Sequence, residues 1–435
     1  MSEKLRVFWF RRDMRLEDNA GLFEALSGDY PVLPLFIFDK HILDELPKND
    51  ARVTFIHHQL ENMRAYLQKH HNSSIATYYD TPENAIKQLI KDFDIEAVYT
   101  NRDYEPYATK RDAEISTLLA KNGIAFHDFK DQVIFEKSEV EKGDGGMYLV
   151  FTPYKNQWKK EFEAINLKTF PSEERLEHTY KNTSLPSVSL NDMGFETSKI
   201  KVPDYQLDRD LIADYEDTRD IPSINGTSRL SPYLRFGTIG YRKVIQKALS
   251  VENETFLDEL IWREFYKAIL FHFPETQHKA FKSKYDRIEW RNNEDEFEKW
   301  KTGQTGYPIV DAGMRQLNET GWMHNRLRMV VGSFLCKHLL IDWRWGEAYF
   351  AEKLLDYDMS SNVGGWQWVA GSGVDAAPYF RVFNPYSQTD RFDKQKKFIK
   401  KWVPEVESKQ YPEPMVEHKM ARERCLDTYK KAVKN

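Results

Sequence analysis

One stretch, residues 356–385, gathers the side chains best suited to hold a cofactor. It reads DYDMSSNVGGWQWVAGSGVDAAPYFRVFNP, with Asp356, Asp358 and Asn362 ahead of Trp366 and Trp368. Residues two apart on a helix point roughly 200° apart around its axis, so the two indoles should face different surroundings. The glycine pair between them would let a flat group approach the backbone closely. A buried core segment with structural tryptophans is the alternative.

A second set of functional types shares one predicted helix face. Glu259, Trp262, Arg263 and Tyr266 follow the i, i+3, i+4, i+7 spacing, which places them on one side of a helix. A carboxylate, an indole, a guanidinium and a phenol together are unusual for a core. The alternative is an ordinary amphipathic surface.

The segment WMHNRLRM, residues 322–329, supplies a third face. Asn325, Arg328 and Met329 fall on one side of a helix. Arg328 could pair with Asp356, and the Asn325 amide could bind the edge of a base or a flavin. Arg326 points elsewhere and could meet a phosphate.

A turn rich in glycine and hydroxyls, residues 225–231 (NGTSRLS), leads into a predicted helix. Backbone N–H groups at a helix start suit a phosphate, although an ordinary N-cap explains the same residues. The chain has no Walker motif and no dinucleotide glycine motif. A basic cluster, which could edge a positive groove or be a solvated face, comprises Arg381, Arg391, Lys394, Lys396, Lys397, Lys400 and Lys401, with Arg315, Arg326 and Arg344.

Composition limits the classes of protein. At 435 residues the chain should form two or more domains. Two cysteines make a disulfide framework or a cysteine zinc site improbable, and no metal is expected; this usage fits a reducing cytoplasm. No signal peptide and no membrane span are expected. The net charge of −5 does not indicate nucleic-acid binding, which local charge must decide.

Alternating strands and helices predict a parallel sheet covered on both faces in the first 130 residues. Strands are expected at 5–10, 32–38, 75–79, 97–100 and 124–127, with helices at 19–26, 51–68, 82–93 and 107–121. Residues 101–107 (NRDYEPY) lie at the carboxyl end of a strand, where such sheets bind ligands. Residues 131–200 predict a connector with a helix at 156–164. Helical periodicity then dominates, at 257–271, 307–319, 325–339 and 346–355.

Together these motifs resemble the photolyase/cryptochrome family of flavoproteins over nearly the whole chain. The resemblance rests on WFRRDMRLEDN, GTSRLSPYLRFG, ELIWREFY, TGYPIVDAGMRQL, WMHNRLRM and DYDMSSNVGGWQW with DAAPYFRVFNP. It implies α/β plus all-α architecture: a Rossmann-like α/β antenna domain at 1–130, a connector at 131–200, and a helical FAD- and DNA-binding domain at 201–435.

Within the family the pattern is most similar to class I cyclobutane pyrimidine dimer (CPD) photolyases. The histidine pair of (6-4) photolyases is missing, because Asn325 and Met329 stand at those positions. Asn362 stands where photolyases place the asparagine that faces flavin N5, and no long signalling tail is expected. A cryptochrome-like blue-light sensor without repair, or repair of (6-4) products, is the alternative.

The resemblance also implies a role for each matching residue. The lesion pocket and catalytic set would be Glu259, Trp262, Asn325, Met329 and Trp368. The FAD-binding set would be Tyr215, Thr227, Ser228, Arg229, Leu230, Ser231, Arg263, Asn325, Arg328, Asp356, Asp358 and Asn362. Electrons would pass along Trp366, Trp343 and Trp290, and DNA would meet Arg326, Arg381, Trp262 and Trp368.

The implied reaction is light-driven electron transfer from excited, reduced, anionic FAD to a dimer flipped out of DNA, which is a carbon–carbon lyase activity. UV-damaged DNA would be recognised by structure and not by sequence, and a monomeric, cytoplasmic enzyme is expected. An antenna pigment (methenyltetrahydrofolate, 8-hydroxy-deazaflavin or a second flavin) would lie near Ile42, Arg52, Asn101, Asp103 and Glu105. None of these residues decides which pigment binds.

Overall fold

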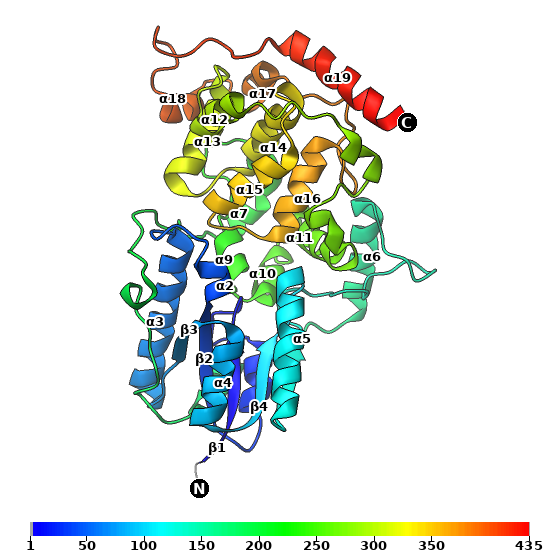
Figure 1. Cartoon of the computed structure of the whole chain (residues 1–435). Helices are drawn as coiled ribbons and strands as arrows, with labels where there is room; N and C mark the ends of the chain where they lie inside the picture. The colour runs from blue at the N-terminus through cyan, green and yellow to red at the C-terminus, as the bar shows by residue number, and fades with distance from the viewer. Residues whose placement is uncertain (1–2, 435) are drawn as a thin grey trace. The chain divides into compact units, whose positions relative to one another are not determined.

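The computed structural model describes residues 3–434, which divide into two compact units (Figure 1). The sheet unit comprises residues 1–139, 160–203 and 230–247. The helical unit comprises residues 140–159, 204–229 and 248–435. The segment predicted as a connector is thus shared between the two units, and part of the segment after residue 225 belongs with the sheet.

The sheet unit contains five parallel strands in the order β3-β2-β1-β4-β5. Their bounds are β1 Lys4–Phe10, β2 Val32–Asp39, β3 Ala76–Asp80, β4 Asp94–Asn101 and β5 Ala125–Phe129. The β2 segment is buried along its whole length, as expected of a strand covered on both faces. The predicted parallel α/β architecture is therefore confirmed.

Helices cover both faces of this sheet. α1 (Ala20–Leu26) and α3 (Ala51–His71) contribute to one core, while α4 (Pro82–Asp92) and α5 (Pro106–Lys121) contribute to the other. The short helix α2 (Lys40–Leu43) follows β2, and α9 (Ser231–Phe236) and α10 (Tyr241–Ala248) come from the later segment.

Apart from the helix α6 (Phe151–Ala164), the predicted connector has little regular structure, and its residues 160–200 belong to the sheet unit. Two short 3₁₀ helices, η1 Ser172–His178 and η2 Asn191–Met193, lie in it. Thr77 N donates to Pro186 O at 2.8 Å, beside the edge strand β3. These partners are distant in sequence, so they leave no local periodic pattern.

The helical unit is built around one large apolar core. Its helices are α7 Arg209–Ala213, α8 Tyr215–Thr218, α11 Thr255–His272, α12 Glu294–Thr302, α13 Pro308–Thr320, α14 Asn325–Ser333, α15 Trp343–Lys353, α16 Met359–Ala370, α17 Pro385–Phe392, α18 Lys397–Trp402 and α19 His418–Lys434, with short 3₁₀ turns η3 Pro274–Gln277 and η4 Ser283–Arg287. The helix α6 (Phe151–Ala164) begins in this unit.

The helix predicted at 325–339 differs from expectation. α14 ends at Ser333 and continues as a π-helix, η5, over Phe334–His338. Residues 330–340 are all buried, so no alternation of apolar and polar residues reveals the change from α to π turn. Such turns occur often at functional sites.

Candidate functional site

The predicted pair between Arg328 on α14 and Asp356 before α16 is present. Arg328 Nη2 lies 2.8 Å from Asp356 Oδ2, and Arg328 Nε donates to Met323 O at 2.9 Å. Asp356 Oδ1 is buried and has no hydrogen-bond partner among residues 3–434. A buried acceptor without a donor is costly, so this oxygen is suited to a hydroxyl or N–H group of a bound molecule.

Asp358 serves the start of α16. Its carboxylate caps the helix by accepting from Ser361 N at 3.3 Å, and it also accepts from the Ser360 hydroxyl. Lys267 Nζ lies 2.8 Å from its other oxygen, and both side chains are nearly buried. Asp358 thereby orients the helix that carries Asn362 and the two tryptophans, and its predicted direct contact with a cofactor stays a prediction.

Asn362 is buried on α16 and held by a residue that sequence reasoning missed, Glu347 of α15. The Asn362 amide nitrogen donates to Glu347 Oε1 at 2.9 Å and to Glu347 O at 3.1 Å. Burial raises the pKa of the Glu347 carboxyl above its usual range, although the hydrogen bonds from Asn362 and Tyr357 oppose the shift. With its nitrogen occupied in this way, Asn362 has its amide oxygen left to offer a ligand.

The glycine pair on α16 has two different roles. A Cβ added to Gly364 would lie 2.3 Å from the Tyr266 ring, so this glycine makes room for a neighbouring side chain of the protein. A Cβ on Gly365 would meet nothing within 4 Å. Only Gly365 therefore faces open space that a flat ring system could enter.

Glu259 on α11 forms an ion pair with Arg219, a second residue that sequence reasoning missed. Arg219 Nη1 lies 2.6 Å from Glu259 Oε1, with side chains 21% and 33% exposed respectively. Burial raises the pKa of Glu259, and the charge of Arg219 opposes the shift. Arg219 lies one helical turn after Tyr215, and that spacing was the only available signal.

The aromatic residues predicted to meet a lesion lie in the helical unit. Trp262 stacks on Phe151, with ring centroids 3.8 Å apart and planes at 10°. Trp368 and Met329 are partly buried against the main core, whereas Asn325 is exposed at the start of α14. Stacking surfaces and an available amide suit an unstacked base.

Of the predicted electron carriers, Trp366 and Trp343 are buried and Trp290 is partly buried. Trp366 has ring contacts with Trp300 at 6.1 Å and with Phe350 at 4.9 Å between centroids. The indole nitrogens of Trp366 and Trp290 are buried, and the described part of the chain offers them no hydrogen-bond partner. Trp300 on α12, which also has ring contacts with Phe297, Tyr349 and Phe350, was not identified from the sequence.

The predicted phosphate loop has one unusual backbone. Arg229 has a positive φ of 53°, and its guanidinium lies over the Trp322 ring at 5.9 Å. Ser228 O accepts from Gln206 N at 2.8 Å. Of the other predicted members, Thr227, Tyr215 and Arg263 are partly buried, Leu230 is buried and Ser231 is the exposed first residue of α9.

The two arginines predicted to contact DNA, Arg326 and Arg381, differ in the interactions that they make within the protein. Arg326 pairs with Asp220 at 2.6 Å and stacks over Phe392 at 4.2 Å. Its charge is thus already compensated within the helical unit. Arg381 is exposed, on the loop between α16 and α17.

Residues predicted near an antenna pigment mostly serve the sheet unit itself. Arg12 pairs with Asp103 at 3.2 Å and with Glu105 at 2.7 Å. Arg52 pairs with Asp50 at 2.5 Å, and Ile42 is 45% exposed. These contacts do not indicate which pigment would bind, so the antenna pigment stays a prediction.

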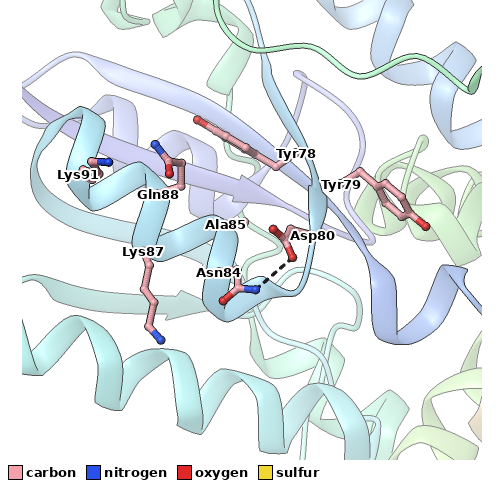
Figure 2. Close-up of a pocket in the computed structure, with 8 residues that line it drawn as sticks. All are labelled: Tyr78, Tyr79, Asp80, Asn84, Ala85, Lys87, Gln88 and Lys91. Carbon is pink, nitrogen blue, oxygen red and sulfur yellow. Dashed lines mark hydrogen bonds between the residues drawn. The ribbon is translucent and has the colours of Figure 1, made fainter. Parts of the chain in front are cut away.

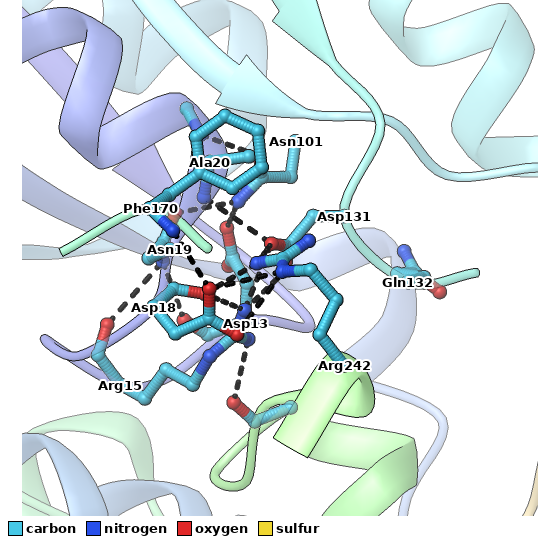
Figure 3. A network of polar contacts seen from close by, with 12 residues as sticks. Asp13, Arg15, Asp18, Asn19, Ala20, Asn101, Asp131, Gln132, Phe170 and Arg242 are labelled. Atoms are coloured by element: carbon cyan, nitrogen blue, oxygen red, sulfur yellow. Dashed lines mark hydrogen bonds and ion pairs between the residues drawn. The ribbon is translucent and has the colours of Figure 1, made fainter. Parts of the chain in front are cut away.

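Asn101 belongs to a buried polar network at the carboxyl end of the sheet (Figure 3). Its amide donates to Asp13 at 2.6 Å and to Asn19 at 2.8 Å. In the same network Asp131 pairs with Arg15 at 2.7 Å and with Arg242 at 2.8 Å. The opening motif thereby joins the first strand to residues 230–247.

A separate pocket, of about 420 Å³, lies beside the edge strand β3 and α4 (Figure 2). Its lining is mixed, with two tyrosines and an alanine beside charged and amide side chains, and contains none of the predicted site residues. Over residues 3–434 no group of three or more metal-ligating side chains occurs, and no helix there is both long and apolar enough to cross a bilayer.

Family comparisons cover both units. Residues 6–174 match the model described as DNA photolyase, and residues 256–410 match the FAD binding domain of DNA photolyase. The deoxyribodipyrimidine photo-lyase of Alkalihalophilus pseudofirmus is 36% identical over 99% of this chain and 98% of its own. The deoxyribodipyrimidine photo-lyase of Escherichia coli is 35% identical over 98% of this chain and 99% of its own.

Solved structures agree over the full chain. A class III photolyase from Agrobacterium tumefaciens has a TM-score of 0.89 at 34% identity, covering 100% of this chain and 99% of its own. An archaeal photolyase from Sulfolobus tokodaii with two FAD molecules has a TM-score of 0.83 at 35% identity, covering 98% of this chain and 100% of its own. A Synechocystis cryptochrome has a TM-score of 0.87 at 25% identity, covering 98% of this chain and 99% of its own.

Proposed function

The chain belongs to the DNA photolyase/cryptochrome family, and from that membership we propose that it splits cyclobutane pyrimidine dimers in DNA, driven by light, with FAD as its cofactor. Full-length relatives named deoxyribodipyrimidine photo-lyase, at 35–36% identity, carry this proposal. The site residues fit FAD, because Asp356 Oδ1 lacks a donor and Gly365 faces open space.

Bound FAD supplies light absorption and a reversible one-electron donation, so the splitting needs no net oxidation or reduction. Arg328 and Asp356 would hold the flavin side of the cofactor. Asn362, with its nitrogen held by Glu347, would present its oxygen to the ring system. The loop at 227–231 would bind the phosphates and the ribityl chain.

The protein's own residues would then receive the lesion. Extruding a damaged step costs a few kcal/mol, and less than extruding an intact one, because it already stacks and pairs poorly. Trp262 and Trp368 would recover about 1–3 kcal/mol per base by stacking. Glu259, whose pKa is raised by burial, would donate a hydrogen bond to a pyrimidine carbonyl when protonated, once Arg219 releases it.

Recognition of the DNA backbone would be independent of base sequence. Arg381 is exposed, and Arg326 would have to exchange Asp220 for a phosphate. We expect binding that is specific for damaged structure and sensitive to salt, by a monomer in the cytoplasm. The class I assignment within the family is part of this proposal.

The test is light-dependent loss of dimers from an irradiated oligothymidine, with a dark reaction as the control. Loss of dimers only in blue or near-ultraviolet light supports the proposal. The similarity to a cryptochrome favours a light sensor as the second candidate. A holoprotein that leaves the dimers intact in the light would favour that sensor, and repair of (6-4) products alone would favour the other alternative.

A further inference from the structure

Lys337 is a buried cation with an unusual partner. Its side chain lies in the π-helix η5, and the residue is 1% exposed. Its ammonium donates to the main-chain oxygen of Arg381 at 2.8 Å, and no carboxylate pairs with it among residues 3–434. The other buried lysine of this unit, Lys267, pairs with Asp358 at 2.8 Å.

Burying an ammonium without a counter-ion is expensive. Burial lowers the pKa of Lys337 to about 8, with Arg381 adding to the shift and Cys336 and Cys425 opposing it. The side chain thus remains mostly protonated at neutral pH. An uncharged core residue at this position would pack at lower cost, so the ammonium indicates a need for a strong donor there.

The acceptor lies on an irregular loop, residues 371–384, between α16 and α17. The backbone hydrogen bonds at its tip are local: Arg381 N donates to Pro378 O at 2.9 Å and Val382 N to Phe380 O at 3.1 Å. The neighbouring Tyr379 stacks on Tyr429 of α19, with centroids 5.9 Å apart. Lys337 therefore links the main chain at the tip of this loop to the helical core by a hydrogen bond.

We propose that Lys337 is a positioning residue for DNA binding, which fixes the pose of Arg381 by holding its main-chain oxygen. The side chain of Arg381 is left exposed, with its guanidinium over the Phe383 ring at 5.3 Å. The proposal rests on the proposed function, because Arg381 is expected there to contact a DNA phosphate.

The experiment compares the holoproteins of wild type, Lys337→Met, Arg381→Gln and the double variant in the dark. Fluorescence anisotropy of a labelled duplex with one thymine dimer gives the binding affinity between about 50 and 200 mM salt. Over this range the affinity falls steeply with the number of phosphate contacts. Each single variant should bind about tenfold more weakly, as for one lost charged contact. The slope of log K against log salt should fall by about 0.9 in each. The double variant should lose nothing further.

Hydrogen exchange without DNA supplies a second readout. Residues 371–384 should exchange faster in Lys337→Met, whereas Arg381→Gln keeps the main-chain acceptor and should exchange like wild type. Tyr429→Phe is the matched control, because the ring is retained and the buried Tyr429 hydroxyl has no hydrogen-bond partner among the residues that the structure describes. This control should match wild type in both readouts.

Additive losses in the double variant, an unchanged affinity of Lys337→Met, or unchanged exchange over 371–384 would overturn the proposal. If Lys337→Met does not accumulate as holoprotein, Lys337→Gln, uncharged and one bond shorter, takes its place. If wild type does not prefer the dimer-containing duplex, the proposed function fails. The exchange comparison still decides whether Lys337 orders the loop.

Discussion

Glu259 reaches the site with its charge already engaged. The 2.6 Å pair with Arg219 favours the carboxylate, whereas burial favours the acid. A DNA lesion entering beside Trp262 would displace more water and shift this balance toward the acid. If the proposed function holds, we therefore expect two states of Glu259, one paired with Arg219 and one free to bind a pyrimidine carbonyl.

Replacing Glu259 with alanine should leave FAD bound and lower the number of dimers repaired per absorbed photon at saturating DNA. The physical reason is the loss of a hydrogen bond that strengthens as negative charge develops on the pyrimidine. Glu259→Gln is the control, since its amide can still donate. Equal quantum yields for wild type and Glu259→Ala would remove Glu259 from the catalytic set.

The tryptophans permit a similarly direct test. Trp290→Phe should slow the photoreduction of oxidised FAD severalfold while leaving repair by pre-reduced enzyme intact, because hole transfer would lose its outer carrier. Trp300→Phe is the matched comparison, since Trp300 contacts Trp366 at 6.1 Å but lies outside the predicted chain. If photoreduction depends on Trp300 and not on Trp290, the electron path runs through α12.

At the scale of the element, α16 is the helix that the site depends on. Its start is set by Asp358, whose side chain caps the helix and pairs with Lys267. Its second turn carries Asn362, and its later turns carry Trp366 and Trp368. A small change in the first turn should therefore alter both the side of α16 predicted to face the cofactor and the side predicted to face the lesion.

Asp358→Ala should destabilise the helical unit by about 3–5 kcal/mol, because it removes the carboxylate that pairs with the buried ammonium of Lys267 at 2.8 Å, and should weaken retention of FAD. Urea unfolding of the holoprotein measures the loss. Asp358→Asn keeps a good cap and should fall between wild type and alanine. In the Lys267→Met background the cost of Asp358→Ala should shrink to that of the cap, about 1 kcal/mol; an undiminished cost would contradict the pairing argument.

Local pattern was sufficient for most elements and for part of the site. β2 is a continuous apolar run because both of its faces are buried, and the Arg328–Asp356 pair was predicted from the opposite charges of two residues in candidate site segments. The pairs of Glu259 with Arg219 and of Arg326 with Asp220 could not be predicted, since they depend on tertiary contacts with a segment, 209–220, that lacks a periodic pattern. The π turn at Phe334–His338 could not be predicted, because the residues around it are all buried and show no periodic pattern.

Across the whole molecule, buried titratable groups make stability depend on pH in two opposite senses. Burial raises the pKa of Asp13 in the sheet unit to about 6. As pH falls, the folded protein therefore protonates Asp13 before the unfolded chain does. The stability that Asp13 contributes is thus present at low pH and is lost as pH rises toward about 6. Burial lowers the pKa of His324 to about 4 and that of His338 to about 3 in the helical unit. These histidines stay neutral when folded, so stability falls as pH drops below about 6.5, the ordinary value.

His324→Asn tests this dependence at one site. His324 caps α14 by accepting from Arg326 N at 3.2 Å, and asparagine is an equally good cap without a titrating ring. With a folded pKa of about 4, His324 should cost about 2 kcal/mol of stability at pH 5 relative to pH 7. The drop in unfolding free energy between these pH values, measured by urea, should therefore shrink by about that amount in the variant. An identical drop in both proteins would mean that the acid sensitivity of the helical unit arises elsewhere, with His338 the next residue to replace.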